Sequence, residues 1–297
     1  MLKFTITGNS KDIRTIENGT FQRISIGMFV GASNSTPDFS KIKVKCMLTR
    51  SGKTIVICND DALKLVTLTQ HFNAANDVAL DPASNQTLVA GSGATGDYVY
   101  NAVIDFGTPI NVSGSDTCII DISHETGTFG SATASGCNIT YTIRDTIGNA
   151  VAIPQITFKQ CQTGQSNYSD SVGNNVTLIG FCSNSTTAYG VSSTRLCTNM
   201  RVDADKITLD EDASAMVARR LSSFETLSNA NNRKQSFVIP FEVPVDRCNI
   251  NFSLNSANIT ATNSWIGVIQ LVHDEETVNR AMARHERHSK QNMSKFQ

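Results

Sequence analysis

The sequence is poor in charge and has no long apolar run. Charged residues make up 17% of its 297 residues and the formal net charge is -1, so bulk electrostatics attract the chain neither to nucleic acid nor to an acidic membrane. No stretch reaches the roughly 18 apolar residues of a membrane-spanning helix, and residues 1–19 lack the apolar core of a signal peptide. We therefore expect a chain that is neither exported nor membrane-spanning, and that meets any charged partner only locally.

The sequence also lacks the motifs of catalytic and cofactor-binding sites. None of its five histidines has the spacing of a metal site, and no GxSxG nucleophile turn occurs. Gly91–Gly96 matches the dinucleotide pattern GxGxxG, but that pattern needs a helix directly after it, and Asp97–Phe106 alternates like a strand. We therefore expect no catalytic residue, no metal site and no cofactor, and interpret Gly91–Gly96 as a glycine loop.

Eight cysteines are present, but no two of them form a CxxC pair. Cys46 falls in phase with the apolar residues Ile42 and Val44, and Cys118 falls in phase with Ile120. Cysteine readily serves as a small buried hydrophobic residue, so this phase favours free thiols in a core. A disulfide framework is the alternative.

The sequence is rich in alternating polar and apolar residues, the pattern of half-buried antiparallel strands. Clusters of Gly, Asn, Ser and Asp separate these runs, as at Asn18–Gly19 and Gly164–Asp170, and such residues are typical of turns. The pattern therefore predicts an all-β fold. The clearest apolar runs are Ile24, Ile26, Met28 and Val30; Tyr98, Tyr100, Ala102, Ile104 and Phe106; and Phe237, Ile239, Phe241 and Val243.

Three segments have helical features. Asp60–Phe72 opens with acidic residues that can cap a helix, although its middle also alternates like a strand. Asp210–Ser228 places apolar residues at helical spacing behind an Asp-Glu-Asp start, and we predict a helix there. The segment from Asp274 onward is acidic first and basic afterwards, as a helix dipole favours.

The two halves of the chain repeat one order of elements, namely several strands, a helical segment and three closing strands. Phe106-Gly-Thr-Pro109 in the first half resembles Phe241-Glu-Val-Pro244 in the second, and the closing strands recur about 130 positions later. The repeat predicts a duplication. The segment Asn73–Asp97 is longer than its counterpart Asn229–Gln235 and is interpreted as an insertion in the first unit.

This duplication predicts two tandem antiparallel barrels. The first barrel occupies residues 1–149 and the second residues 150–273, because each half holds enough apolar residues for a core of its own. Residues 274–297 remain as a basic C-terminal helix or tail.

The C-terminal segment holds a local concentration of charge. Residues 280–297 contain several basic residues and a single acidic residue, Glu286. A basic amphipathic arm can lie on an anionic lipid surface or touch nucleic acid, whereas the alternative is a solvated tail. The residues predicted to contact a membrane or a neighbouring copy are Arg280, Arg284, Arg287, Lys290 and Lys295.

Two β-barrels in tandem, each with a helix before its last three strands, resemble the double jelly-roll major capsid proteins of tailless icosahedral viruses with an internal membrane, and most of all the FLiP-like phages. The resemblance covers the whole chain but rests on architecture. It implies two jelly rolls, homotrimers of pseudo-hexagonal outline with lateral capsomer contacts, and a place in the virion after assembly in the host cytoplasm. It also implies internal membrane lipids and minor capsid or penton proteins as partners, and no sequence-specific binding of nucleic acid.

Two other functions compete with a capsid role. The polar, Asn- and Thr-rich loops favour a receptor- or glycan-binding β-sandwich module, such as a spike or an adhesin. A carbohydrate-active enzyme on a jelly-roll scaffold is the third hypothesis, since fold does not imply function.

Overall fold

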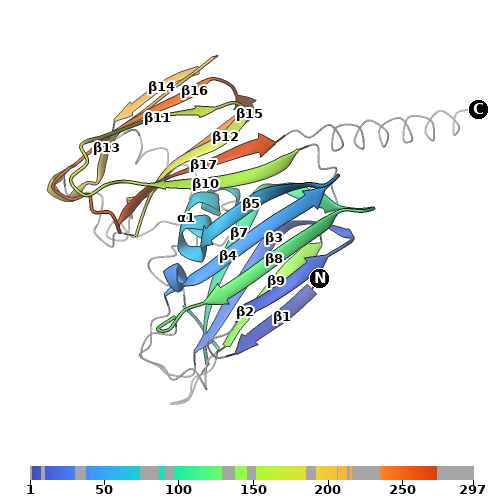
Figure 1. Cartoon of the computed structure of the whole chain (residues 1–297). Coiled ribbons are helices and arrows are strands. Elements are labelled where there is room, and N and C mark those ends of the chain that lie inside the picture. Colours follow the sequence, from blue (N-terminus) through green and yellow to red (C-terminus); the bar gives the residue numbers. More distant parts are fainter. Residues whose placement is uncertain are drawn as a thin grey trace, which may run out of the picture.

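The structure is a computed structural model that describes residues 2–7, 11–30, 38–73, 87–90, 97–128, 138–145, 152–184, 192–205, 207–212, 215 and 235–272. Within these residues, antiparallel strands form four sheets. The sheets pair into two sandwiches of jelly-roll type, here named barrel 1 and barrel 2, which follow one another along the chain (Figure 1). The predicted all-β fold of two tandem jelly rolls is confirmed.

Barrel 1 combines a five-stranded and a four-stranded sheet. The first sheet has the order β1 (Leu2–Thr7), β9 (Asn138–Asp145), β3 (Gly19–Val30), β7 (Asp97–Val112) and β6 (Thr87–Ala90). The second sheet has the order β2 (Lys11–Ile16), β8 (Thr117–His124), β4 (Ile42–Arg50) and β5 (Lys53–Asp61). The short 3-10 helix η1 (Phe39–Lys41) precedes β4, and helix α1 (Ala62–Asn73) follows β5.

Barrel 2 is formed by two four-stranded sheets. The first has the order β10 (Ile153–Gln160), β17 (Ser264–Val272), β12 (Val176–Ser183) and β15 (Phe237–Val245). The second has the order β11 (Asn167–Gly173), β16 (Cys248–Leu254), β13 (Cys197–Ala204) and β14 (Ile207–Asp212). The 3-10 helix η4 (Ser192–Thr194) precedes β13.

Both barrels follow the same path. If β6 is left aside, the first, eighth, third and sixth strands of each barrel form one sheet, and the second, seventh, fourth and fifth form the other. This order is that of a jelly roll, in which the chain winds as two Greek keys. The sheet of β1, β9, β3 and β7 in barrel 1 therefore corresponds to the sheet of β10, β17, β12 and β15 in barrel 2. These two sheets are here named the docking sheets.

The duplication extends to local irregularities. In barrel 1, Gln22 of β3 is an extra residue opposite a bulge at Phe106–Pro109 of β7. In barrel 2, Thr177 of β12 is an extra residue opposite a bulge at Phe241–Pro244 of β15. The Phe-x-x-Pro segments that look alike in the sequence therefore occupy the same place in the two barrels. Bulges of this kind bend a strand and re-aim its side chains.

Where the structure describes the side chains of the predicted apolar runs, they are buried as the sequence predicts, apart from Val243. Ile42, Val44, Cys46 and Leu48 are completely buried, and Ile24, Ile26, Met28, Phe237 and Ile239 also belong to the core. Val243 is the exception, with 71% of its surface exposed, because the bulge shifts the register of β15 before this residue is reached.

The predicted helices have different outcomes. The first is confirmed as α1, where the Asp61 carboxylate caps the helix by accepting the backbone N–H of Lys64 at 2.9 Å. The start predicted for the second at Asp210 is wrong, because Asp210–Asp212 ends strand β14 and pairs with β13. The structure describes only Ala215 of the following stretch, and it is helical. The segment from Asp274 lies outside the described residues.

The predicted insertion contains a strand that the sequence pattern did not indicate. Strand β6 lies within Asn73–Asp97 and pairs with β7 at the edge of the five-stranded sheet. The glycine loop Gly91–Gly96 lies outside the described residues, but β7 begins directly after it at Asp97. A strand instead of a helix at this point removes the structural basis for a dinucleotide site.

Candidate functional site: the joint between the barrels

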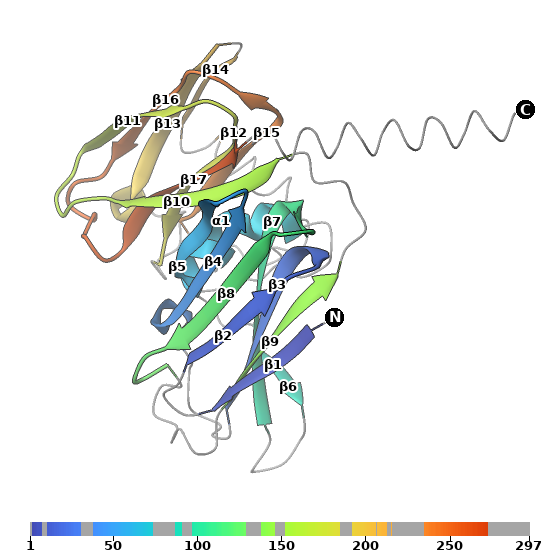
Figure 2. The ribbon, with the colours of Figure 1, turned by 45° about the vertical axis from the view of Figure 1, so that its right-hand side comes forward.

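Helix α1 lies between the two barrels and contributes to both (Figure 1 and Figure 2). One side of the helix packs with the core of barrel 1, where Leu65 and Val66 are buried. Its other side packs on the outer face of the docking sheet of barrel 2, where Leu178, Trp265 and Ile269 join the same apolar cluster. Strands β5 and β7 of barrel 1 also contact β10. The joint is therefore a continuous apolar core rather than a loose linker.

Two glycines allow the helix to approach the docking sheet closely. Gly180 of β12 and Gly267 of β17 are directly opposite each other in the sheet. A Cβ atom at Gly267 would lie 2.8 Å from both methyl carbons of Leu68 and from the ring of Phe158, and one at Gly180 would lie 2.8 Å from Leu68. A side chain at either position would therefore force Leu68 to shift, since such contacts are shorter than carbon atoms tolerate.

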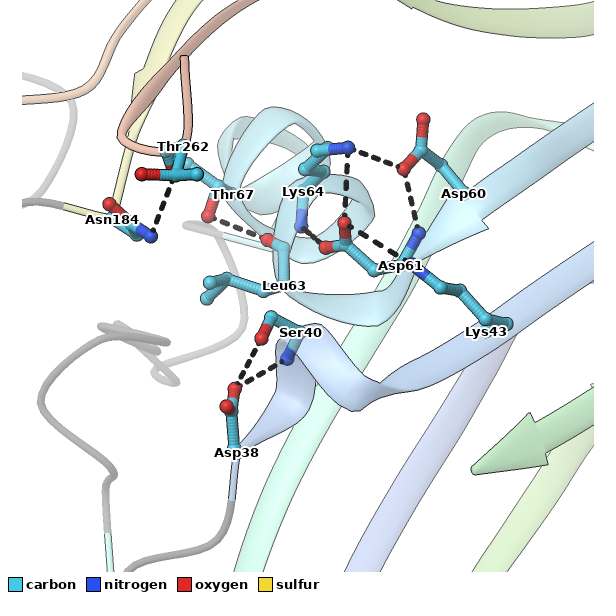
Figure 3. Close-up of polar contacts among 10 residues, drawn as sticks. All are labelled: Asp38, Ser40, Lys43, Asp60, Asp61, Leu63, Lys64, Thr67, Asn184 and Thr262. Atoms are coloured by element: carbon cyan, nitrogen blue, oxygen red, sulfur yellow. Dashed lines mark hydrogen bonds and ion pairs between the residues drawn. The ribbon is translucent and has the colours of Figure 1, made fainter. Parts of the chain in front are cut away.

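A charged cluster fixes the first turn of α1 (Figure 3). The Lys64 ammonium group contacts the carboxylates of Asp60 at 2.8 Å and of Asp61 at 3.1 Å, and Lys43 lies 4.0 Å from Asp61. The same ammonium group lies 5.8 Å from the centre of the Trp265 ring in barrel 2, a distance suited to a cation–π contact. Lys64 thus connects an acidic pair of barrel 1 to an aromatic ring of barrel 2.

Burial and charge act in opposite directions on this cluster. Burial raises the pKa of the Asp61 carboxyl above its ordinary value, although the Lys64 N–H and ammonium groups pull it down. Burial alone would lower the pKa of Lys64, but the two carboxylates outweigh it and the pKa is raised. Lys64 therefore stays charged, as its contact with Trp265 requires.

Both Phe-x-x-Pro bulges open onto one pocket at the joint, with a volume of about 410 Å³. Phe106 and Phe241 come from the two bulges, and Phe72 comes from the last turn of α1. Gly107 has a φ angle of +72°, and a Cβ there would lie 2.6 Å from the Phe72 ring, so glycine is required for both conformation and space. The lining is mainly apolar, with Glu242 as its acidic side chain.

The thiols do not form a site among the described residues. All seven described cysteines are free and buried, as the phase of the strands predicts, and Cys137 lies outside the described residues. Cys46 and Cys118 are in contact, with their sulfur atoms 3.8 Å apart. Burial raises the pKa of Cys58 to about 12 and that of Cys161 to about 11, which keeps these thiols protonated and unreactive.

A polar clamp joins the two sheets of barrel 1 and gives a pH-dependent prediction. The Asp12 carboxylate accepts hydrogen bonds from the Tyr141 hydroxyl at 2.6 Å and from Arg14 at 2.8 Å. Burial raises the pKa of Asp12, but these bonds outweigh it and hold the pKa below the usual 3.8. The clamp therefore contributes stability that is present above the unfolded-state pKa and is lost as the pH falls through the lower folded-state pKa.

We expect Asp12→Asn to lower the free energy of unfolding near neutral pH, and this difference should shrink as the pH falls through the lowered pKa of the wild-type carboxyl. Urea denaturation at a series of pH values measures this difference. Tyr141→Phe removes one of the two donors, so it should change the pH dependence in the same direction by a smaller amount. A wild type and an Asp12→Asn variant with parallel pH profiles would contradict the prediction.

The residues predicted from the sequence and those found at the joint differ. Arg280, Arg284, Arg287, Lys290 and Lys295 lie outside the described residues, so their predicted contacts stay predictions. Within the described ranges, no group of three or more His, Cys, Asp or Glu side chains could hold a metal ion. None of the described helices is long and apolar enough to cross a membrane.

Four residues of the joint were not predicted from the sequence, namely Gly180, Gly267, Leu68 and Trp265. A signal was nevertheless present, because each glycine has apolar residues on both sides within its strand. A lone glycine inside a strand often marks a place where another backbone or side chain approaches closely.

The fold has solved counterparts. No protein-family model matches the chain, and no curated protein matches its sequence. One similar structure is the crystal structure of the major capsid protein of STIV, with a TM-score of 0.55 and 9% sequence identity. The similarity covers 92% of this chain and 97% of the STIV chain. A chain from the atomic structure of Sulfolobus Turreted Icosahedral Virus is similar over 96% of this chain and 98% of its own, with a TM-score of 0.51 and 8% identity.

A third similar structure is the major capsid protein P2 from bacteriophage PM2, at a TM-score of 0.45 and 13% identity, covering 92% of this chain and 99% of its own. Sequence identities this low indicate a shared fold but give no information on activity. Taken with the strand order of both barrels, the first two structures show that this chain has the double jelly-roll fold of the STIV major capsid protein.

Proposed function

We propose that the chain is a structural virion protein, the major capsid protein of an icosahedral virus, and not an enzyme. The observation that carries the proposal is the rigid joint between two equivalent barrels, in a chain whose fold matches that of the STIV major capsid protein along nearly its whole length. A shell subunit needs a fixed shape more than it needs a chemical site. The apolar helix α1 supplies that shape by locking barrel 1 to barrel 2.

The joint also supports a trimer. It is heterologous, because barrel 1 contributes its helix while barrel 2 contributes the outer face of its docking sheet. Each barrel has a docking sheet of the same strand order, since the two barrels share one topology. Heterologous contacts produce a ring when the rotation closes, and three double-barrel chains would give six barrels and a pseudo-hexagonal outline.

Sedimentation velocity and electron microscopy of the purified chain test this assignment. We expect homotrimers, and shells or flat sheets of them at higher concentration. A chain that stays monomeric at about 100 µM, well above the dissociation constants of stable assemblies, would overturn the proposal.

The proposal includes the finer organisation predicted from the sequence. Residues 1–149 and 150–273 form the two barrels, and residues 274–297 form a basic arm. The trimers tile a shell over an internal membrane in the virion, after assembly in the host cytoplasm, with minor capsid or penton proteins as further partners. The fit of strands Leu2–Asp145 and Ile153–Val272 to two separate sheet pairs supports the first boundary.

The basic arm gives a prediction about lipid. Each basic residue near an anionic surface contributes about 1 kcal/mol of binding, so replacing all five should abolish binding to vesicles that contain anionic phospholipid. We expect the wild type to float with such vesicles and the variant to stay at the bottom of the gradient. The five positions replaced by Gln are Arg280, Arg284, Arg287, Lys290 and Lys295.

A matched control removes the same charge from the barrels. It replaces five exposed basic residues by Gln, and it should float as the wild type does if the arm is what binds. Equal loss of flotation in both variants would show that total charge, and not the arm, is responsible. The control positions are Lys11, Lys53, Lys159, Arg201 and Arg247.

One observation favours the alternative of a glycan-binding module. The outer face of the sheet of β11, β16 and β13 carries a polar hollow of about 420 Å³, where Ser169, Asp203, Asn249 and Asn251 offer hydroxyl, carboxylate and amide groups. Such groups suit sugar hydroxyls. Binding on a glycan array that Asn251→Leu abolishes, in a chain that never assembles, would select this function over the capsid role.

A further inference from the structure

The pocket between the two Phe-x-x-Pro bulges, here named the joint pocket, has the size of a small-molecule site. Its volume of about 410 Å³ lies within the range of about 300 to 1,000 Å³ that is typical of such sites. Barrel 1 contributes α1 and β7 to its walls, and barrel 2 contributes β12, β15 and β17. A molecule bound there would therefore contact both barrels at once.

Three phenylalanine side chains form much of the apolar lining. Phe106 belongs to the core of barrel 1 and Phe241 to the core of barrel 2, while Phe72 lies in the last turn of α1. The Phe106 ring makes an edge-to-face contact with Phe21, and the two ring centres are 6.3 Å apart. Aromatic rings bind apolar groups, and their negative faces also attract cations.

Hydrogen bonds hold the two bulges in place around the joint pocket. The Gly107 N–H donates to the Asp105 carboxylate at 2.9 Å, and this buried carboxylate also accepts bonds from two side chains of β3. In barrel 2, the Thr177 hydroxyl donates to the Ile269 carbonyl at 3.2 Å. The walls are therefore formed before a ligand enters, which reduces the entropy that binding costs.

Glu242 gives the joint pocket a negative charge. It is the acidic residue among the described residues that line the pocket, and none of these residues is Lys, Arg or His. Glu242 is exposed, whereas the three phenylalanines are buried or half-buried, so the charge lies nearer the solvent than the rings do. An anion would be repelled there without a compensating cation. An organic cation would instead gain an ion pair with Glu242 and a favourable contact with the rings.

We infer that the joint pocket binds a small organic cation, whose apolar body lies among the three phenylalanine rings and whose ammonium group pairs with Glu242. The inference goes beyond the proposed function and holds whether or not the chain assembles. Because both barrels form the walls, the ligand binds only where the barrels are joined, and it should stabilise that arrangement by mass action. The stability of the joint would then depend on a soluble ligand.

Three probes with one apolar body test the preference for a cation. They are 4-phenylbutylamine, 4-phenylbutanol and 4-phenylbutyrate, titrated into the full chain near neutral pH by isothermal titration calorimetry. We expect the amine to bind with a dissociation constant of about 0.1 to 1 mM, which ligands of this size can reach. The alcohol should bind about threefold more weakly and the carboxylate at least about tenfold more weakly. A carboxylate that binds as tightly as the amine, or an amine that does not bind at about 5 mM, would overturn the inference.

Glu242→Gln tests where the ammonium group lies. The variant should bind the amine about threefold more weakly, and only as tightly as it binds the alcohol, whose affinity should not change. The matched control is Glu125→Gln, which removes an exposed carboxylate directly after β8 that does not line the pocket, and it should bind the amine like the wild type. An unchanged affinity in Glu242→Gln, or an equal loss in both variants, would contradict the assignment of Glu242.

Thr108→Trp tests where the apolar body lies, because Thr108 lines the joint pocket and an indole ring there would fill part of it. We expect this variant to bind neither the amine nor the alcohol, and the amine should no longer raise its thermal unfolding temperature as it raises that of the wild type. Thr208→Trp places the same side chain on an exposed position of β14 and should keep both effects. Wild-type binding by a folded Thr108→Trp would overturn the inference, and Glu242→Gln decides the question if Thr108→Trp does not fold.

Discussion

Gly267→Val should destabilise the chain by separating α1 from barrel 2. The new side chain would begin 2.8 Å from both Leu68 methyl carbons and from the Phe158 ring. Overpacking a dense interior costs about 1 to 3 kcal/mol, and more where the surroundings cannot shift. Urea denaturation followed by Trp265 fluorescence should report this loss, because the Trp265 ring lies within the joint.

The number of steps in the urea unfolding curve tests this role more directly than the loss of stability does. One apolar cluster spans both barrels in the wild type, so we expect a single cooperative transition, whereas Gly267→Val should unfold in two steps as the barrels uncouple. Ser169→Val adds the same side chain to an exposed strand position, and it should change stability by less than about 0.5 kcal/mol. A single, unshifted transition in Gly267→Val would contradict the role assigned to the glycine.

A double-mutant cycle tests whether the strain in Gly267→Val comes from contact with Leu68. Leu68→Ala alone should cost about 2 to 5 kcal/mol, since it leaves a cavity between the barrels. It also removes the methyl carbons that a valine side chain at position 267 would meet, so the double variant should be more stable than the sum of the single effects predicts. The expected coupling is about 0.5 to 3 kcal/mol, and strictly additive effects would place the strain elsewhere.

The strands were predictable because burial on one face of a sheet leaves a period of two in the sequence. Ile42 to Leu48 and Cys118 to Ile122 show this pattern in every second residue, and all of those apolar side chains are buried. The duplication was predictable for a similar reason, since the bulge at Phe106–Pro109 needs particular residues and recurs at Phe241–Pro244.

Other features depend on contacts that a local pattern does not contain. The acidic stretch Asp210–Asp212 looks like a helix start, but β13 lies beside it and pairs with it as a strand, so that only Asp212 acts as a cap. The joint is still harder to predict from the sequence. Gly180 and Gly267 are needed because Leu68, which belongs to the other barrel, packs against them. Tertiary partners of this kind override local preference.

Arg50→Leu should destabilise barrel 1 strongly, because it leaves a buried carboxylate without its counter-ion. Arg50 at the end of β4 and Asp116 just before β8 are 2.9 Å apart, with side chains only 4% and 0% exposed. Arg50 also donates a hydrogen bond to the backbone carbonyl of Asn111 in β7 at 2.6 Å. The guanidinium group therefore ties both sheets of the barrel together at one end.

Removing one partner of a buried pair typically costs about 3 to 5 kcal/mol, whereas an exposed pair contributes about 0 to 1 kcal/mol. The matched control is Arg201→Leu, because Arg201 and Asp203 form a pair of 2.8 Å whose side chains are 51% and 41% exposed. We expect denaturation to show a large loss for Arg50→Leu and a small one for Arg201→Leu.

Replacing both partners separates the two contributions to that loss. Arg50→Leu with Asp116→Leu no longer buries a carboxylate without its counter-ion, so it should recover part of the stability that Arg50→Leu loses. The bonds to the Asn111 carbonyl and from the Ser113 N–H stay broken. Recovery would show that the uncompensated Asp116 charge dominates the cost of the single variant. A double variant as unstable as the sum of the single ones would instead mean that the separate hydrogen bonds of Arg50 to Asn111 and of Asp116 to Ser113, and not the charge pair, hold this end of barrel 1 closed.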